Sequence, residues 1–218
     1  MADFISGESL PDYKILNWVA QCNRRIVRPL DSSERNGLSA FEYGWKAVNA
    51  LYKPFAGDSE TKKLRACLDT YLDGEVFIKR AKADIFGLCG DFLSDDLTIP
   101  PSPADAHDTA LQAKRYAKSL KAALKNNNGK AIYLLAHLLY IVRNARVHAD
   151  LYMGSSAMVS ASGRTIRKSP FHHLPSITLE LCIHLLCGKT KASRPAIQKL
   201  VKARTDQLLA EIKSNLAG

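Results

Sequence analysis

Apolar residues recur at helical spacing along most of this chain of 218 residues. In residues 10–30, for example, the apolar stripe is formed by Ile15, Val19, Cys22 and Ile26. No segment shows the strict alternation of apolar and polar residues that a half-buried strand requires. Helices that each carry one apolar stripe can bury it only against one another, so the pattern predicts an all-α antiparallel bundle.

Proline, glycine and capping residues divide the pattern into separate expected helices. These cover residues 10–30, 39–55, 59–72, 75–93, 108–126, 131–152, 176–189 and 193–216. Ser39, Ser59 and Ser193 are expected as N-caps, because a serine hydroxyl can accept a free amide of the first helical turn. The polar stretches 94–108 and 154–175 are expected to be loops.

The composition is that of one globular domain, with 46% hydrophobic and 24% charged residues. We expect a single domain over residues 1–218, with a candidate internal boundary in loop 94–106 and an appended basic helix at 189–218. No apolar run reaches the roughly 18 residues that span a bilayer. The first residues lack the basic and apolar regions of a signal peptide. The sequence therefore predicts a cytoplasmic protein without a membrane partner.

The cysteines show no disulfide framework. Their number is odd and their spacing irregular: Cys22, Cys67, Cys89, Cys182 and Cys187. Such cysteines are typical of reduced, mostly buried thiols. Cys182, His184 and Cys187 could suggest a metal site, but the first two would lie on nearly opposite faces of a helix. Neither a metal ion nor another cofactor is therefore expected.

The chain is basic, with a formal net charge of +10. The excess is concentrated in two expected helical regions: residues 101–130 carry +4 and residues 189–218 carry +5. Such runs are compatible with a polyanionic partner, and a solvated helix face explains each of them equally well. Charge alone therefore does not identify the partner.

The most apolar expected helix ends in a dense polar cluster, within "YIVRNARVHADLYMG" at residues 140–154. Arg143, Asn144 and His148 form the pattern R-N-x-x-x-H. In a chain of this composition the pattern is expected by chance only about 0.015 times. The same Arg-to-His spacing recurs from Arg167 to His172, but Pro170 between them excludes a regular helix there.

This pattern resembles the R-N-x-x-x-H signature of HEPN-domain ribonucleases. The stretch "FEYGWKAVNALY" at residues 41–52 is also similar to an early helix of several HEPN families, through Trp45, Asn49, Ala50 and Tyr52. The resemblance implies a HEPN-like helical bundle that dimerises through its motif helix, so that two motifs line one cleft. It also implies RNA as the substrate, and an antitoxin or a defence-system protein as a further partner.

The resemblance implies a metal-independent endoribonuclease that leaves 2′,3′-cyclic phosphate ends, in a toxin or antiphage role. Arg143 would stabilise the charge of the transition state, His148 would move a proton, and Asn144 would orient His148 or the phosphate. The residues expected to bind the RNA backbone are Arg146, Lys114, Arg115, Lys199 and Lys202. Some HEPN toxins carry a modifiable Tyr two residues after the motif His. Asp150 stands there in this chain, which puts that form of control in doubt.

Other interpretations of the same residues remain open. Arg143, Arg146 and His148 could simply meet the free carbonyls and the dipole at a helix C-terminus. The chain could be a non-catalytic HEPN-like module that binds RNA or a nucleotide, or that serves as a scaffold. It could also bind DNA through its basic last helix. His137 is expected to be a core residue, whereas His172 and His173 are expected in a flexible loop that could cover RNA.

Overall fold

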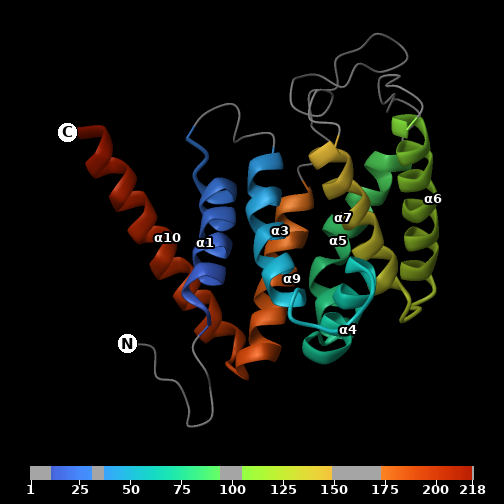
Figure 1. The fold of residues 1–218 in the computed structure, drawn as a ribbon, viewed down its shortest axis with the longest axis horizontal. Coiled ribbons are helices and arrows are strands. Elements are labelled where there is room, and N and C mark those ends of the chain that lie inside the picture. Colours follow the sequence, from blue (N-terminus) through green and yellow to red (C-terminus); the bar gives the residue numbers. More distant parts are fainter. Residues whose placement is uncertain (1–10, 31–36, 94–104, 149–172, 218) are drawn as a thin grey trace. The chain divides into compact units, whose positions relative to one another are not determined.

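The computed structural model describes residues 11–30, 37–93, 105–148 and 173–217, with only the backbone described for 105–110, 145–148 and 217. The described part is helical and contains no strand (Figure 1). Its helices are α1 (Tyr13–Val27), α3 (Leu38–Tyr52), α4 (Glu60–Tyr71), α5 (Gly74–Leu93), α6 (Asp105–Lys125), α7 (Ala131–His148), α9 (His173–Thr190) and α10 (Arg194–Ala217). The predicted all-α class is confirmed for these residues. None of the described helices is long and apolar enough to cross a membrane.

Serine caps start two of the helices as predicted. The hydroxyls of Ser59 and Ser193 each accept the amide three residues further on, at 3.3 Å and 3.4 Å. The prediction for Ser39 is wrong, because α3 begins one residue before it. Gly37 occupies the N-cap position with φ 80°, a left-handed conformation that glycine adopts at little cost.

The helices belong to two compact units. The first unit consists of the chain up to Phe77 and from Pro175 onward, and it contains α1, α3, α4, α10 and most of α9. The second unit, Ile78–Leu174, contains α6, α7 and most of α5. Residues 94–104 lie outside the described part of the chain, so the boundary expected in that loop stays a prediction.

In the first unit, α1 packs against both α3 and α10, and α3 also contacts α4. Gly44 on α3 allows a close approach of its neighbours. A Cβ atom there would lie 2.7 Å from Thr178 Cγ2 and 3.2 Å from Cys22 Sγ. The Cys182 thiol donates to the Gly44 carbonyl at 3.3 Å. The missing side chain therefore lets α1, α3 and α9 meet at one point.

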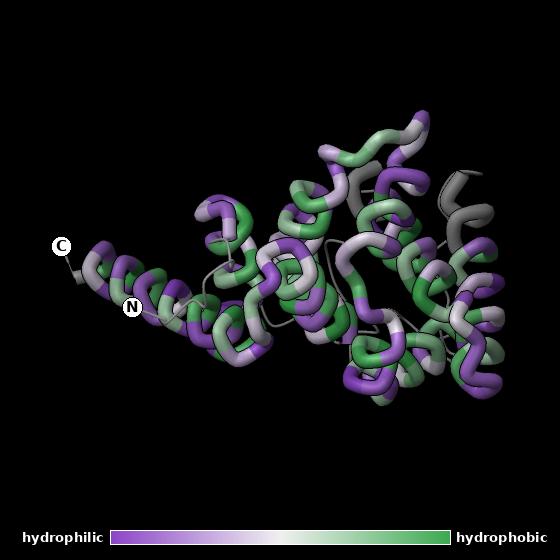
Figure 2. Tube along the Cα trace, turned by 90° about the horizontal axis from the view of Figure 1, so that it is seen from below, coloured by the Kyte–Doolittle hydropathy of each residue, from purple (hydrophilic) through white to green (hydrophobic). Residues whose placement is uncertain are grey.

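Hydrophobic and hydrophilic residues alternate along the trace of α10 (Figure 2), and its buried residues recur at helical spacing. Its buried residues include Ile197, Val201 and Leu208. Polar contacts fix the same side of α10 to α1. Thr205 is buried and accepts the side-chain amide of Asn23 at 3.1 Å. Packing and hydrogen bonds thus hold at least the first half of α10 on α1.

In the second unit, α6 and α7 lie side by side and antiparallel (Figure 1). The turn between them uses Asn127 with φ 48° and Asn128, whose side chain accepts the amide of Lys130 at 2.9 Å. Ala113 and Ala117 are buried on α6, and such small residues allow close helix packing. The buried face of α7 is formed largely by Leu135, Leu138, Leu139 and Val142. The R-N-x-x-x-H motif lies on α7 of this pair.

Candidate functional site

The R-N-x-x-x-H motif occupies the last six residues of α7, Arg143 to His148. The residues just before it, Leu138, Leu139, Ile141 and Val142, are buried. Arg143 and Asn144 are the first polar pair after this run, and both are partly exposed. The polar cluster therefore begins on the accessible part of a helix whose other face is anchored in the core.

Arg143 and Asn144 are joined directly. The Arg143 Nη1 group donates to Asn144 Oδ1 at 2.8 Å. Asn144 thus restricts the position of the guanidinium, a role that the sequence analysis did not assign to it.

The backbone of α7 is helical through His148. Because Asn144 and His148 are four residues apart on this helix, the two positions share one helix face. The side chains of Arg146 and His148 lie outside the described part, so their predicted roles stay predictions. The structure therefore brings together two of the three predicted catalytic residues and gives the backbone position of the third.

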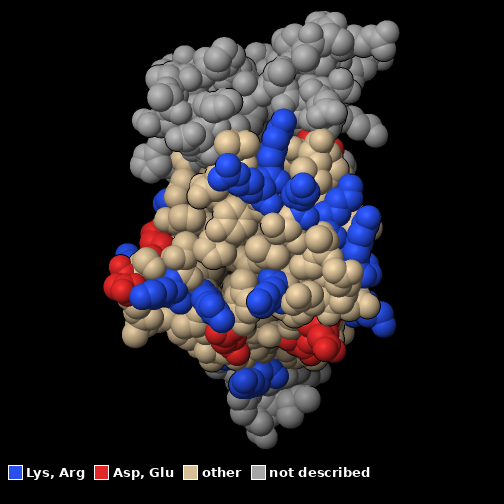
Figure 3. Space-filling model, turned by 90° about the vertical axis from the view of Figure 1, so that its right-hand side faces the viewer, with Lys and Arg blue, Asp and Glu red and all other residues tan. Residues whose placement is uncertain are grey.

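The second unit is strongly basic. Its described side chains include ten Lys and Arg but only two Asp, a net charge of +8. Five of these cations lie on α6, where Arg115 is exposed and Lys114 is partly exposed. The side of the molecule where α6 lies shows many Lys and Arg side chains (Figure 3). The surroundings of the motif helix would therefore attract a polyanion.

The two predicted RNA-binding residues of α10 belong to the other unit. Lys199 and Lys202 are both exposed there. Arg204, one turn further along, is held by Glu211 at 2.8 Å and by Asn17 at 3.0 Å. A solvated helix face accounts for these α10 cations, so RNA contact by Lys199 and Lys202 stays a prediction.

The only two described carboxylates of the second unit flank one histidine. Asp84 Oδ1 lies 3.0 Å from His173 Nδ1, and Asp91 Oδ2 lies 4.0 Å from His173 Nε2. The ring lies against Gly87, where a Cβ atom would come within 2.3 Å of Nε2. His173 is the first residue of α9, so its predicted place in a loop is wrong. His172 lies outside the described residues.

This histidine cluster was missed by the sequence analysis. Asp84, Gly87 and Asp91 are spaced to face one side of α5, which is a readable signal. Their partner is 89 residues away from Asp84, and nothing in the sequence indicates that pairing. Asp84 and Asp91 both lie beside His173. All other charged side chains described in this unit are positive.

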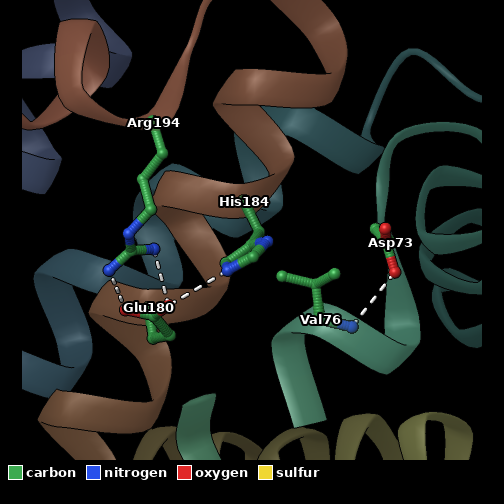
Figure 4. A network of polar contacts seen from close by, with 5 residues as sticks. All are labelled: Asp73, Val76, Glu180, His184 and Arg194. Carbon is green, nitrogen blue, oxygen red and sulfur yellow. Dashed lines mark hydrogen bonds and ion pairs between the residues drawn. The ribbon is translucent and has the colours of Figure 1, made fainter. Parts of the chain in front are cut away.

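A second network joins α9 to the start of α10 (Figure 4). Arg194 donates two hydrogen bonds to the carboxylate of Glu180, at 2.6 Å and 2.8 Å, and His184 Nε2 lies 3.0 Å from the same carboxylate. Burial alone would raise the pKa of Glu180. The hydrogen bonds and charges of His184 and Arg194 outweigh burial and lower that pKa from 4.5 to about 2. Because Arg194 and His184 hold its carboxylate, Glu180 is better suited to stabilising the fold than to accepting a proton as a base.

Glu180→Gln is expected to lower the free energy of unfolding at pH 7 by about 2 kcal/mol. The folded pKa of Glu180 is depressed, so its ionised form stabilises the fold above pH 4.5 and loses this effect as the pH falls toward 2. The difference between wild type and variant should therefore shrink over that interval. Urea denaturation at several pH values between neutral and acidic measures it.

Asp69→Asn is a matched control for this measurement. The Asp69 side chain is 50% exposed and lies 3.9 Å from Arg65 in a surface ion pair. Such pairs contribute little, so its effect should stay within about 0.5 kcal/mol. A difference for Glu180→Gln that is independent of pH would show that the carboxylate charge does not stabilise the fold.

The cysteines are placed as packing residues. Cys22, Cys67, Cys89 and Cys182 are buried and Cys187 is partly buried, as predicted. Burial raises the pKa of Cys22 and of Cys67 to about 12 and that of Cys89 to about 11. A thiol with such a pKa stays protonated at neutral pH and is a poor nucleophile. Cysteine chemistry is therefore a weak explanation of function for this chain.

The residues discussed as a metal site have separate partners. The Cys182 thiol bonds to the carbonyl of Gly44, whereas His184 lies against Glu180 and, edge to face, against Phe77. Within the described ranges, no three His, Cys, Asp or Glu side chains are grouped so that they could hold a metal ion.

Comparisons of the chain with models of protein families, with curated proteins and with solved structures found no match. The proposed function is therefore based on the sequence motif and on the geometry of the described residues.

Proposed function

We propose that this protein is a HEPN-type endoribonuclease that cuts RNA without a metal ion, in a toxin or antiphage defence role. One observation carries the proposal: the R-N-x-x-x-H motif lies at the end of α7, where Arg143 and Asn144 are partly exposed and joined by a hydrogen bond. The described side chains of the same unit have a net charge of +8, which adds the electrostatic attraction that an RNA substrate requires.

The reaction needs only a proton carrier and a stabiliser of negative charge. The 2′-hydroxyl of a nucleotide attacks the adjacent phosphorus, the bond from phosphorus to the 5′-oxygen breaks, and a 2′,3′-cyclic phosphate remains. His148 moves a proton, since imidazole titrates near neutral pH. Arg143 donates to the phosphate oxygens as their charge grows. Asn144 holds Arg143 in place and shares a helix face with position 148.

Two protons must move in this reaction, one from the attacking hydroxyl and one to the leaving oxygen. Each motif supplies a single histidine. A two-fold pairing of the motif helices would place two copies of His148 and Arg143 in one cleft, because a two-fold interface presents the same surface from both chains. The proposed partners are accordingly RNA, a second copy of the chain and an antitoxin or defence-system protein.

The test is cleavage of RNA in the presence of EDTA by the wild type and by His148→Ala, with the 3′ ends of the products identified. Cleavage by the wild type alone, with cyclic phosphate ends, is the expected result. Equal cleavage by both proteins would show that the activity does not depend on His148. Absence of cleavage, together with retained RNA binding, would favour the non-catalytic HEPN-like binding module. Binding to duplex DNA that survives the substitution would favour the DNA-binding alternative.

A further inference from the structure

Four lysines form a straight row along α6. They follow one another at intervals of four, three and four residues: Lys114, Lys118, Lys121 and Lys125. At about 100° per residue they fall within an arc of roughly 60°, and the buried side chains described on α6 lie outside that arc. Lys118 and Lys125 are exposed, whereas Lys114 and Lys121 are partly exposed. The lysine row therefore lies on a part of α6 that solvent reaches.

No acidic side chain neutralises the lysine row. Each of its members has another lysine three or four residues away, and residues 109–130 contain no Asp or Glu. None of the four lysines forms an ion pair with a carboxylate of the described part of the chain. Like charges at these spacings destabilise a helix. A helix face that keeps them without compensation is typical of a surface that binds a polyanion.

Cations on other helices show a different arrangement. Lys62 on α4 lies 2.8 Å from Asp58, four residues before it. Arg204 on α10 lies 2.8 Å from Glu211. Both cations thus share their surface with a carboxylate, as is usual for a solvated face of mixed charge. The lysine row of α6 contains cations alone, so solvation of a mixed face does not describe it.

The residues beside the lysine row favour RNA over a membrane surface. A helix that lies in a membrane surface carries large apolar side chains next to its cations. From residue 112 to the end of α6, no exposed side chain is a large apolar one. From Lys114 to Lys125 the row extends over about 16.5 Å of helix axis. This length corresponds to about five nucleotides of one strand at a rise of roughly 3.4 Å each.

The lysine row ends close to the level of the motif along the helix pair. α6 and α7 are antiparallel, and the Tyr116 ring of α6 lies on the His137 ring of α7, with centroids 5.3 Å apart. His137 is partly exposed there rather than buried in the core as predicted. Lys114 precedes Tyr116 by two residues, so it lies level with about residue 139 of α7. Arg143 is four residues further on, about 6 Å along the axis. A strand that follows the row therefore reaches the level of the motif.

We infer that the four lysines of α6 bind consecutive phosphates of the RNA strand that the motif cuts. The inference rests on the proposed function, because it names how the substrate of that site is held. It adds Lys118, Lys121 and Lys125 to the predicted contact Lys114. A lysine binds phosphate as a point charge and does not read a base, so the row sets the path of the strand and accepts any sequence.

The test is the salt dependence of binding to a single-stranded RNA of about ten nucleotides, measured by fluorescence anisotropy. The probe is 2′-O-methylated at every sugar, so it cannot undergo the proposed cleavage. Lys118→Gln and Lys125→Gln should each reduce the steepness of log Kd against log salt by about 0.7 and weaken binding about fourfold at about 0.15 M salt, because one phosphate contact is lost. Lys118→Arg keeps the charge and should keep the slope. Lys53→Gln removes an exposed cation of the first unit and should change neither quantity.

The outcomes separate this inference from the proposed function. An unchanged slope in both glutamine variants at α6, or an equal change in Lys53→Gln, would overturn the lysine row. Failure of the wild type to bind the probe would overturn it as well. Loss of binding to phosphatidylserine vesicles in the α6 variants, with RNA binding unchanged, would identify a membrane surface instead.

A slope that depends on the row, without cleavage of unmodified RNA by the wild type, would support the row and count against the nuclease. Cleavage by the wild type with an unchanged slope in the α6 variants would overturn the row alone. Circular dichroism confirms that each variant is folded before its binding is scored.

Discussion

Arg143→Ala is expected to reduce RNA cleavage about a thousandfold while leaving the fold intact. The side chain is partly exposed at the end of a buried helix segment, so its removal opens no cavity in the core. The loss arises in the transition state, where the guanidinium faces more negative charge than it does in the bound substrate. Single-turnover cleavage with enzyme in excess measures this loss, and RNA-binding affinity measured alongside should change far less.

Two further variants test the geometry of this site. Arg143→Lys keeps the positive charge but loses the planar fork that donates to Asn144 and to phosphate together, so most of the activity should still be lost. Asn144→Ala removes the contact that positions Arg143 and should cost less than the loss of Arg143 itself. Full activity in Arg143→Lys would show that only a nearby positive charge is needed. Full activity in Arg143→Ala would show that Arg143 takes no part in the mechanism.

The helices and much of their packing could be predicted from local patterns. Helical periodicity depends on neighbouring residues, and it predicted the apolar stripe of α1, of which Ile15, Val19 and Cys22 are buried. The start of α9 was predicted three residues too late, because Pro175 suggested a loop. Proline fits the first turn of a helix, where its missing amide would have no helical partner. The helix therefore begins at His173 and includes Pro175.

The candidate site was predictable only where its residues are neighbours in sequence. The Arg143–Asn144 contact joins adjacent residues. The contact between Asp84 and His173 spans 89 residues, and a single sequence gives no signal for such a pairing.

Gly188→Ala is expected to lower the free energy of unfolding by more than about 3 kcal/mol. A Cβ atom at Gly188, near the end of α9, would lie 1.9 Å from the carbonyl oxygen of Tyr71 and 2.6 Å from its carbonyl carbon. These are backbone atoms at the last residue of α4, so no side-chain rotation can relieve the clash. One of the two helix ends must move, which disrupts packing in the first unit.

Two other glycines provide a graded comparison in urea denaturation followed by far-UV circular dichroism. Gly90 on α5 has no atom within 4 Å of an added Cβ, so Gly90→Ala should stabilise by about 0.5–1 kcal/mol, because alanine favours the helix. Gly44→Ala meets the Thr178 methyl group at 2.7 Å, a side chain that can shift, and should fall between the other two. The predicted order of stability is therefore Gly90→Ala, then Gly44→Ala, then Gly188→Ala. A Gly188→Ala protein as stable as the wild type would show that α4 and α9 do not approach each other as closely as this backbone contact requires.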